Sequence, residues 1–231
     1  MTSAHSLLTL LRPLDWAALV LFVGGWAVYN WYADKATESD RGLRGVTHRY
    51  RVQWGLRMVA RENRIVDAAL TGNLMNSTSF YANATIYIIA GLIAVAGTLE
   101  QLMRFTEELP FVRAQTKQLL EIKIFLLITI FIFAYFKFTW ALRQFNILSI
   151  LIGAAPPADA PPAELAPFAE RYGILNTLAG DEFNRGIRAY YFGFAALGWF
   201  IGAAMFIATT LLILFVLWRR DFHSKTLAGL Q

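Results

Sequence analysis

The fold of this chain is decided by residues 63–101, which read NRIVDAALTGNLMNSTSFYANATIYIIAGLIAVAGTLEQ. The stretch has no proline, begins polar and becomes apolar enough to cross a bilayer, so it predicts one long helix that enters a membrane. Small or amide-bearing residues recur in it at every seventh position, and seven residues are close to two helical turns. These residues are Ala69, Asn76, Asn83, Ala90 and Gly97. Because another helix packs on such a line, we expect it to form the packing core of a bundle.

The composition is that of a membrane protein. Of the 231 residues, 57% are hydrophobic and 16% are charged, whereas about 25% are charged in soluble domains. We interpret residues 1–231 as a single transmembrane domain with no room for a second, soluble one. The absence of cysteine excludes disulfides, thiolate metal sites and a cysteine nucleophile. The net charge of +5 indicates contact with anionic lipid headgroups, and nucleic-acid binding is not expected.

Four apolar stretches are long enough to span a bilayer, which takes about 20 helical residues. They are residues 15–33, 79–99, 122–142 and 189–218. We therefore predict an all-α integral membrane bundle of four transmembrane helices, some of which extend beyond the bilayer. The third helix is expected to continue to Ile152, and the long fourth stretch is expected to tilt or protrude.

The connectors are distinct in composition. Residues 34–63 are rich in arginine, and Leu43, Val46, Tyr50 and Trp54 recur there at helical spacing. This pattern predicts a basic amphipathic helix at the membrane surface. Residues 153–167 are rich in proline and alanine and predict an extended loop, followed by a helical piece over about 163–180.

The distribution of basic residues predicts an orientation. The first and third connectors hold twelve Lys and Arg residues and the other flanks hold eight, with Lys137 left unassigned. The positive-inside rule then places these two connectors in the cytoplasm and both termini outside. The sequence Trp218-Arg219-Arg220 is typical of a cytoplasmic helix end and argues against this orientation.

Candidate pathway residues lie on three of the predicted spans. Asn76 and Asn83 either hydrogen-bond across a helix interface or line a polar pathway. Lys137, among aromatic residues, either extends to the membrane surface or serves a function that offsets the cost of a buried charge. Arg143 and Asn146 follow on the same helix, and Arg188 and Tyr190 begin the fourth span; these either anchor the protein at lipid headgroups or form a basic vestibule for anions. We expect any site to lie where the amide line meets these basic residues.

A second packing motif occupies the fourth span. Gly198 and Gly202 form a GxxxG pattern, which lets two helix backbones approach closely in lipid.

The sequence gives little indication of an enzyme. The histidines, His5, His48 and His223, are far apart and lack metal-ligand spacing, and the predicted spans contain no internal Asp or Glu. We expect no catalytic residue, no metal and no cofactor; a membrane enzyme acting on lipid is the remaining alternative.

Three segments resemble one membrane family. They are Asn63–Gly97, Phe138–Asn146 with Leu151–Gly153, and Gly186–Phe192 with Trp218–Phe222. They are similar to the "domain of unknown function 599" family of bacteria and plants. The resemblance implies an integral membrane protein of four spans, brings no known activity, and suggests Asn76, Arg143, Asn146, Arg188 and Tyr190 as shared positions.

The predicted function is that of an oligomeric channel- or transporter-like protein of the bacterial inner membrane, with a polar Asn and Lys seam. The alternative is a non-catalytic scaffold or accessory subunit of a larger complex. The expected partners are anionic membrane lipids and either further copies of the chain or another membrane subunit.

Overall fold

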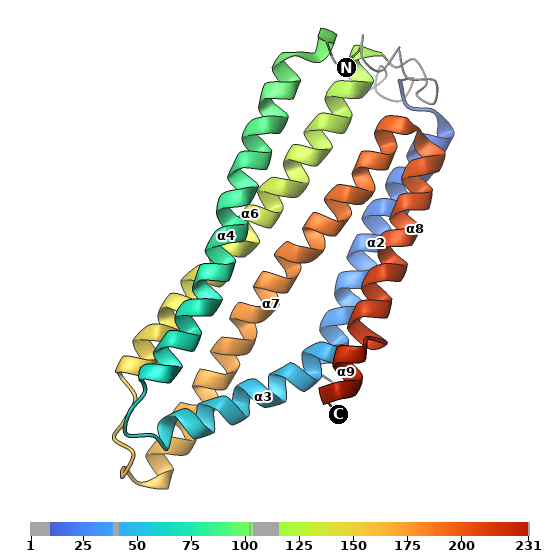
Figure 1. The fold of residues 1–231 in the computed structure, drawn as a ribbon. Helices are drawn as coiled ribbons and strands as arrows, with labels where there is room; N and C mark the ends of the chain where they lie inside the picture. The colour runs from blue at the N-terminus through green and yellow to red at the C-terminus, as the bar shows by residue number, and fades with distance from the viewer. Residues whose placement is uncertain (1–9, 39–41, 102, 104–115, 231) are drawn as a thin grey trace, which may run out of the picture. The chain divides into compact units, whose positions relative to one another are not determined.

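The computed structural model describes residues 10–38, 42–101, 103 and 116–230. Every regular element in these ranges is a helix, so the all-α prediction is confirmed. In chain order the helices are α2 (Pro13–Glu38), α3 (Gly42–Val59), α4 (Ile65–Gly97), α6 (Lys117–Gly153), α7 (Pro162–Ile201), α8 (Ala203–Phe222) and α9 (Lys225–Leu230) (Figure 1). His5 lies outside the described residues.

Polar side chains determine where several helices begin. The Asp15 carboxylate accepts a hydrogen bond from the Arg12 backbone N–H at 3.1 Å, next to the start of α2. Asn63 Oδ1 accepts from Ile65 N at 3.0 Å before α4, and Ser224 Oγ accepts from Leu227 N at 3.1 Å before α9. These bonds satisfy N–H groups that a helix leaves free in its first turn.

The contacts divide the chain into two compact units. Unit 1 consists of residues within 1–32, 85–133 and 188–218, and unit 2 of residues within 33–84, 134–187 and 219–231. Because the boundaries fall inside helices, α2, α4, α6, α7 and α8 each contribute a segment to both units.

Unit 1 has an aromatic core. The Phe22 ring contacts the rings of Phe192 and Phe206 at centroid distances of 5.5 and 5.0 Å. Trp199 stacks on Phe206 at 5.3 Å and is fully buried. Its indole N–H donates to Asp15 Oδ1 at 2.8 Å, so the polar edge of this large side chain is satisfied inside the core.

The fourth predicted span is wrong as a single helix. Residues 189–218 are divided between α7 and α8, because the helix ends at Ile201 and a new one begins at Ala203. Thr209 Oγ1 on α8 donates to the backbone oxygen of Ala195 on α7 at 2.8 Å, and Trp199 stacks on Phe206. These contacts require the chain to reverse at Gly202, since a straight helix would separate Ala195 and Thr209 by about 21 Å.

The amphipathic helix expected in the first connector is present as α3, but it packs on protein. Val46 is fully buried, and the Trp54 indole N–H donates to Asp67 Oδ1 at 2.6 Å. At the crossing of α3 and α7, a side chain on Gly55 would meet the backbone oxygen of Ala169. The helix therefore belongs to the core of unit 2.

The line predicted on α4 lies outside the core. Ala69, Asn76, Asn83, Ala90 and Gly97 are all exposed, so the expectation that they form the packing core is not met. The buried line of α4 contains three threonines, Thr71, Thr78 and Thr85, together with Asp67 and Ala82. The threonines also repeat every seven residues, and a threonine hydroxyl that bonds within its own helix, as Thr78 Oγ1 does to the Leu74 oxygen at 2.8 Å, is compatible with burial.

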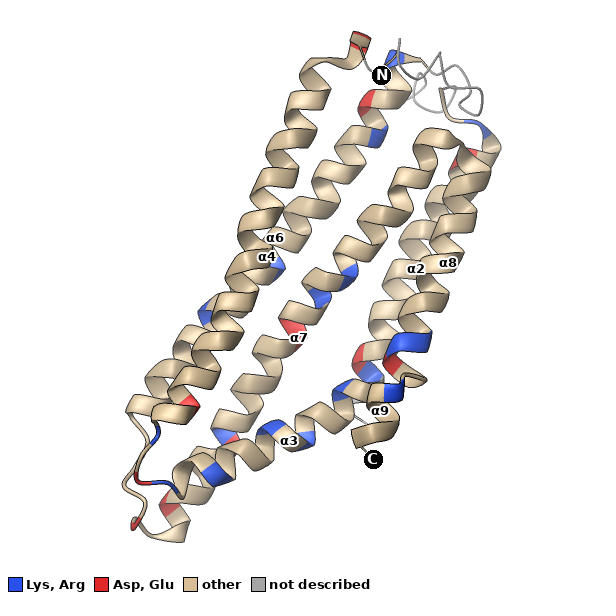
Figure 2. Cartoon of the chain, viewed as in Figure 1, with Lys and Arg blue, Asp and Glu red and all other residues tan. Residues whose placement is uncertain are grey.

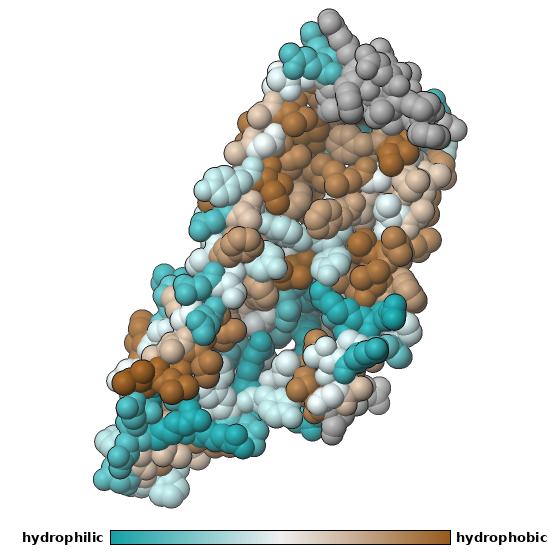
Figure 3. All heavy atoms as spheres, in the orientation of Figure 1, coloured by the Kyte–Doolittle hydropathy of each residue, from teal (hydrophilic) through white to brown (hydrophobic). Residues whose placement is uncertain are grey.

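Three helices are long and apolar enough to cross a membrane: Ile65–Gly97, Lys117–Gly153 and Ala203–Leu230. They make the chain compatible with a membrane protein, whereas the predicted count of four spans is not confirmed. Apolar side chains are exposed over unit 1, among them Phe125, which is 70% exposed, and Phe194, which is 60% exposed. Figure 3 shows this surface in brown, and it is far more apolar than water-exposed surfaces usually are.

The C-terminal segment packs on the first connector. Tyr50 OH on α3 donates to the backbone oxygen of Leu230 at 3.4 Å, and Gly42 lies against Asp221 and Phe222. Segments in contact cannot lie on opposite sides of a membrane, so the prediction of a cytoplasmic first connector with an outside C-terminus is wrong. The reversal at Gly202, which the sequence did not reveal, accounts for the error.

Candidate functional site

A chain of ion pairs runs through unit 2 and joins four helices. Its members alternate in charge and are Asp181, Arg44, Asp34, Arg185, Glu182 and Lys137. They come from α2, α3, α6 and α7. Figure 2 shows acidic and basic residues close together in the middle of α7. We call this set the charged network.

Arg44 is the first bridge in the charged network. One guanidinium nitrogen of Arg44 lies 2.6 Å from Asp34 Oδ1, and another lies 2.8 Å from Asp181 Oδ1. The Arg44 side chain is only 10% exposed, so both of its ion pairs are formed largely away from water. Arg44 thereby fixes α2 and α7 to α3 through charge-assisted hydrogen bonds, which are about twice as strong as neutral ones.

Arg185 is the second bridge. It donates to Asp34 Oδ2 at 2.7 Å and to Glu182 Oε1 one helical turn earlier. The other oxygen of Glu182 lies 2.8 Å from Lys137 Nζ, and the Glu182 side chain is 9% exposed. Burial would raise the pKa of the Asp34 carboxyl, but its bonds to Arg44 and Arg185 lower the pKa below its usual value.

A seventh charge adjoins the charged network. The Arg51 guanidinium lies against Gly180, where the absence of a side chain leaves space for it. Burial lowers the pKa of Arg51, although the nearby charge of Asp181 opposes this effect. With Arg51, the group holds four cations and three anions.

A buried amide lies one turn before Gly180. Asn176 is 0% exposed, and neither its side-chain oxygen nor its nitrogen has a hydrogen-bond partner. The neighbouring Thr177 hydroxyl contacts His48 Nδ1 at 2.8 Å. An unpaired buried amide is costly, so Asn176 marks a polar point inside this part of α7.

Sequence reasoning found one member of the charged network, Lys137. Lys137 lies on α6, a candidate membrane helix, and its pair with the Glu182 carboxylate offsets the cost of burying its charge. The carboxylates were missed because α7 was expected to begin near residue 189, whereas it is continuous from Pro162 and carries Asp181 and Glu182 in its interior. The signal that could have found them is the helical pattern of residues 163–201, which has no proline after Pro167.

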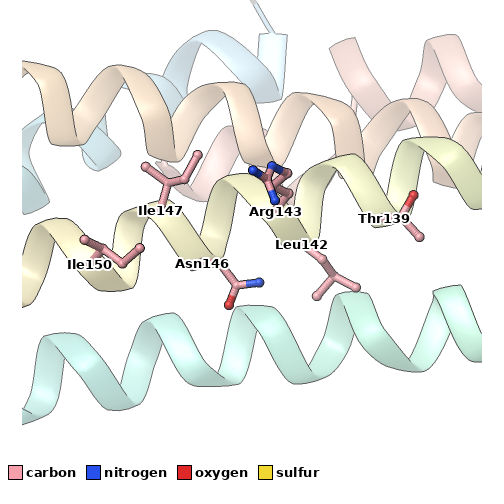
Figure 4. Close-up of a pocket in the computed structure, with 6 residues that line it drawn as sticks. All are labelled: Thr139, Leu142, Arg143, Asn146, Ile147 and Ile150. Carbon is pink, nitrogen blue, oxygen red and sulfur yellow. The ribbon is translucent and has the colours of Figure 1, made fainter.

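Arg143 and Asn146 are placed together on the exposed face of α6. A depression of about 420 Å³ is lined by Thr139, Leu142, Arg143, Asn146, Ile147 and Ile150. Figure 4 shows that Leu142 and Asn146 point to the side where α4 lies and that Arg143 lies at the opposite edge of the pocket. This arrangement presents one cation and one amide on an apolar surface.

The remaining candidates are dispersed. Asn76 and Asn83 are exposed on α4, whereas Arg188 is only 1% exposed and belongs to unit 1. Tyr190 OH lies 2.7 Å from the hydroxyl of buried Thr85, and its ring meets Phe131 edge-on. Arg188 and Tyr190 are thus built into the protein rather than displayed to lipid headgroups.

The predicted packing residues behave differently from one another. Gly198 packs closely on α8, where a side chain would meet Thr209 and the backbone of Met205. Gly202 lies at the reversal and has open space around it. Ala69, Ala90 and Gly97 are exposed on α4.

Among the described residues, no group of three or more His, Cys, Asp or Glu side chains could hold a metal ion.

Comparison with known proteins gives one match. Residues 17–226 match the family model described as "Protein of unknown function, DUF599". No curated protein and no solved structure matches the chain.

Proposed function

We propose that this chain, which belongs to the DUF599 family of proteins of unknown function, is a membrane transport protein that moves a small anion. The observation that carries the proposal is the charged network with Arg51, in which cations outnumber carboxylates by one. Ionisable residues on or beside membrane helices are expensive and commonly mark ion pathways.

The substrate class follows from the excess charge. Arg44, Arg185 and Lys137 each contact a carboxylate, whereas Arg51 makes no ion pair among the described residues. A half-buried guanidinium that forms no direct ion pair favours an anionic guest, although the charge of Asp181 is near. The amide of Asn176, four residues before Gly180, adds hydrogen-bonding groups on the same helix.

The proposed mechanism uses the ion pairs as connections that can be exchanged. An anion near Arg51 competes with Asp181 for the cations around it, which weakens the link from α3 to α7. A ligand that binds one arrangement of helices better than another shifts the population toward it. The proposed location is the bacterial inner membrane.

Reconstituted full-length protein tests the proposal. We expect proteoliposomes to show flux of at least one anion among chloride, nitrate, phosphate and small carboxylates. Arg51→Gln should reduce this flux about tenfold or more, because a lost charge-assisted bond costs roughly 1.5–3 kcal/mol. Arg49→Gln is the matched control, since Arg49 is exposed on the same helix. Absence of flux for all anions would contradict transport, and equal flux in the folded Arg51→Gln and Arg49→Gln variants would contradict the role given to Arg51.

A second candidate function, a scaffold or accessory subunit, rests on the exposed line of α4. Ala69, Asn76 and Asn83 form a surface on which a second copy of the chain could pack, because small residues permit close approach of helices. We propose a homo-oligomer on this basis. An oligomer in native mass spectrometry that Asn83→Leu dissociates, in a protein with no anion flux, would favour the scaffold.

A further inference from the structure

Arg143 is an exposed cation on a helix with the apolarity of a membrane span. Its guanidinium makes no hydrogen bond or ion pair with the described residues, and Asn146 follows one turn later, also exposed. A charge on a lipid-facing surface is costly unless it reaches the headgroup region or a counter-charge. The depth of Arg143 therefore decides what it can bind.

The pairing of α4 with α6 gives this depth. Tyr81 stacks on Phe138 at 5.5 Å, and the Ser149 hydroxyl donates to Met75 Sδ at 3.6 Å, so the two helices are antiparallel within unit 2. Interpolating between these contacts places Arg143 beside about residue 78 of α4.

Both helices change character at that level. On α4 the polar residues Asn76 and Ser77 are followed by an apolar stretch that starts at Phe80. On α6 residues 124–142, in which Lys137 is the one charged residue, end just before Arg143 and span about 28 Å, close to the thickness of a hydrocarbon core. In a bilayer centred on this stretch, Arg143 would lie at the boundary between hydrocarbon and headgroups, where lipid phosphates are found.

Two depressions meet at this residue. Besides the one on the Asn146 side, a second of about 490 Å³ is lined by Phe136, Lys137, Thr139, Trp140 and Arg143. Phe136 and Trp140 are 63% and 51% exposed. Arg143 and Thr139 line both depressions. They therefore lie between the first depression, which contains Asn146, and the second, which contains the aromatic side chains.

We propose that this surface is a binding site for an anionic phospholipid. The lipid phosphate binds the Arg143 guanidinium, the Asn146 amide contacts the headgroup, and an acyl chain lies along Phe136 and Trp140. Arginine binds phosphate through two parallel hydrogen bonds, which a single ammonium cannot reproduce. The site faces outward from α6, and Lys137, which it shares with the charged network, is already paired with Glu182.

Trp140 provides a direct test. The full-length protein is placed in nanodiscs of phosphatidylcholine with a small fraction of brominated lipid, either dibromo-phosphatidylglycerol or dibromo-phosphatidylcholine. Because the chain has seven tryptophans, the signal of Trp140 is taken as the difference between the parent protein and Trp140→Phe. We expect the brominated phosphatidylglycerol to quench Trp140 several-fold more efficiently than the brominated phosphatidylcholine.

The variants assign the preference to the phosphate contact. Arg143→Gln should abolish the preference and Arg143→Lys should retain part of it. Arg171→Gln should leave it unchanged, because Arg171 is exposed on α7 and bonds to its own helix at Pro167. Equal quenching by the two lipids, or a preference that survives Arg143→Gln, would overturn the proposal.

A free anion is distinguished from a lipid by a third arm. Inorganic phosphate at millimolar concentration should not displace the brominated phosphatidylglycerol. Displacement that depends on Arg143 would reassign the site to soluble phosphate and overturn the lipid assignment.

Discussion

At the scale of single residues, two glycines allow α3 to cross α7 closely. A Cβ atom on Gly55 would lie 2.5 Å from the Ala169 backbone oxygen, and one on Gly173 would lie 2.8 Å from the Val52 Cα. Both obstacles are backbone atoms, which cannot rotate away as a flexible side chain can. The crossing therefore depends on the absence of side chains at both positions.

Gly55→Ala should destabilise the protein. The forced separation of α3 and α7 should cost about 1–3 kcal/mol, which exceeds the gain in helix propensity of up to about 1 kcal/mol. We expect a thermal unfolding midpoint in detergent several degrees below that of the parent. Gly72→Ala is the control, because Gly72 is also in a helix but a Cβ atom added to it would have no neighbouring atom within 4 Å. The unfolding midpoint of this variant should equal or exceed that of the parent. A rise for Gly55→Ala as well would contradict the close crossing.

At the scale of the helices, the reversal at Gly202 changes what the fourth apolar run means. Hydropathy cannot distinguish one long helix from two antiparallel ones when the turn is a single glycine between apolar residues. The contacts that define the hairpin, such as that between Thr209 and Ala195, are tertiary.

A disulfide can detect the hairpin, and the chain has no cysteine of its own to interfere. The variant with Gly198→Cys and Thr209→Cys should form an intramolecular disulfide on mild oxidation, because a Cβ on Gly198 would touch the Thr209 side chain. In a single straight helix these positions would be about 16 Å apart.

The matched control for this disulfide keeps the same spacing. Leu197→Cys with Ala208→Cys places both thiols on exposed positions and should stay reduced. After oxidation, free thiols are alkylated with a reagent that changes gel mobility, so the mobility of the protein shows whether the disulfide has formed. Equal oxidation of the two pairs would argue against the hairpin.

The sequence pattern of α4 predicts the helix correctly but does not predict which face is buried. Residues 65–97 could be predicted as one helix, because they lack proline and turn apolar, and this is what forms. Two lines repeat every seven residues in it, the Ala and Asn line and the threonine line. The repeat does not say which line is buried; burial depends on the partner helices, and here the threonines face them.

The candidate site was harder to predict than the helices. Lys137 stood out because it interrupts an apolar stretch, and that signal was sound. Its partner Glu182 follows it by 45 residues, in a segment expected to precede a span. Arg44 and Asp34 come from the first part of the chain, far from both. Ion pairs between distant segments depend on tertiary structure and therefore cannot be predicted from the spacing of residues within one segment.

At the scale of the whole molecule, the contact between α3 and the C-terminal segment revises the orientation. With the tail on the side of the first and third connectors, that side holds fifteen Lys and Arg residues against five on the other, with Lys137 again unassigned. The positive-inside rule then places the C-terminus in the cytoplasm more firmly than it placed the original arrangement.

Single cysteines should report this orientation in intact cells. Thr226→Cys, exposed on α9, should resist a membrane-impermeant maleimide until the membrane is permeabilised. Thr116→Cys, exposed before α6, should react from outside. The reverse pattern would place the arginine-rich side outside and contradict the revised orientation.

The charged network also has a consequence for how this protein can change over evolutionary time. Arg44, Asp34, Arg185 and Glu182 each contact two partners of opposite sign, whereas Asp181 and Lys137 are the two ends and join the network through Arg44 and Glu182. Losing an internal member removes an ion pair from two neighbours at once, so we expect such a loss to be tolerated mainly with a compensating second change. The terminal positions can drift singly, which leads us to expect variation among homologues to begin at the ends of the network and to enter its middle only in pairs.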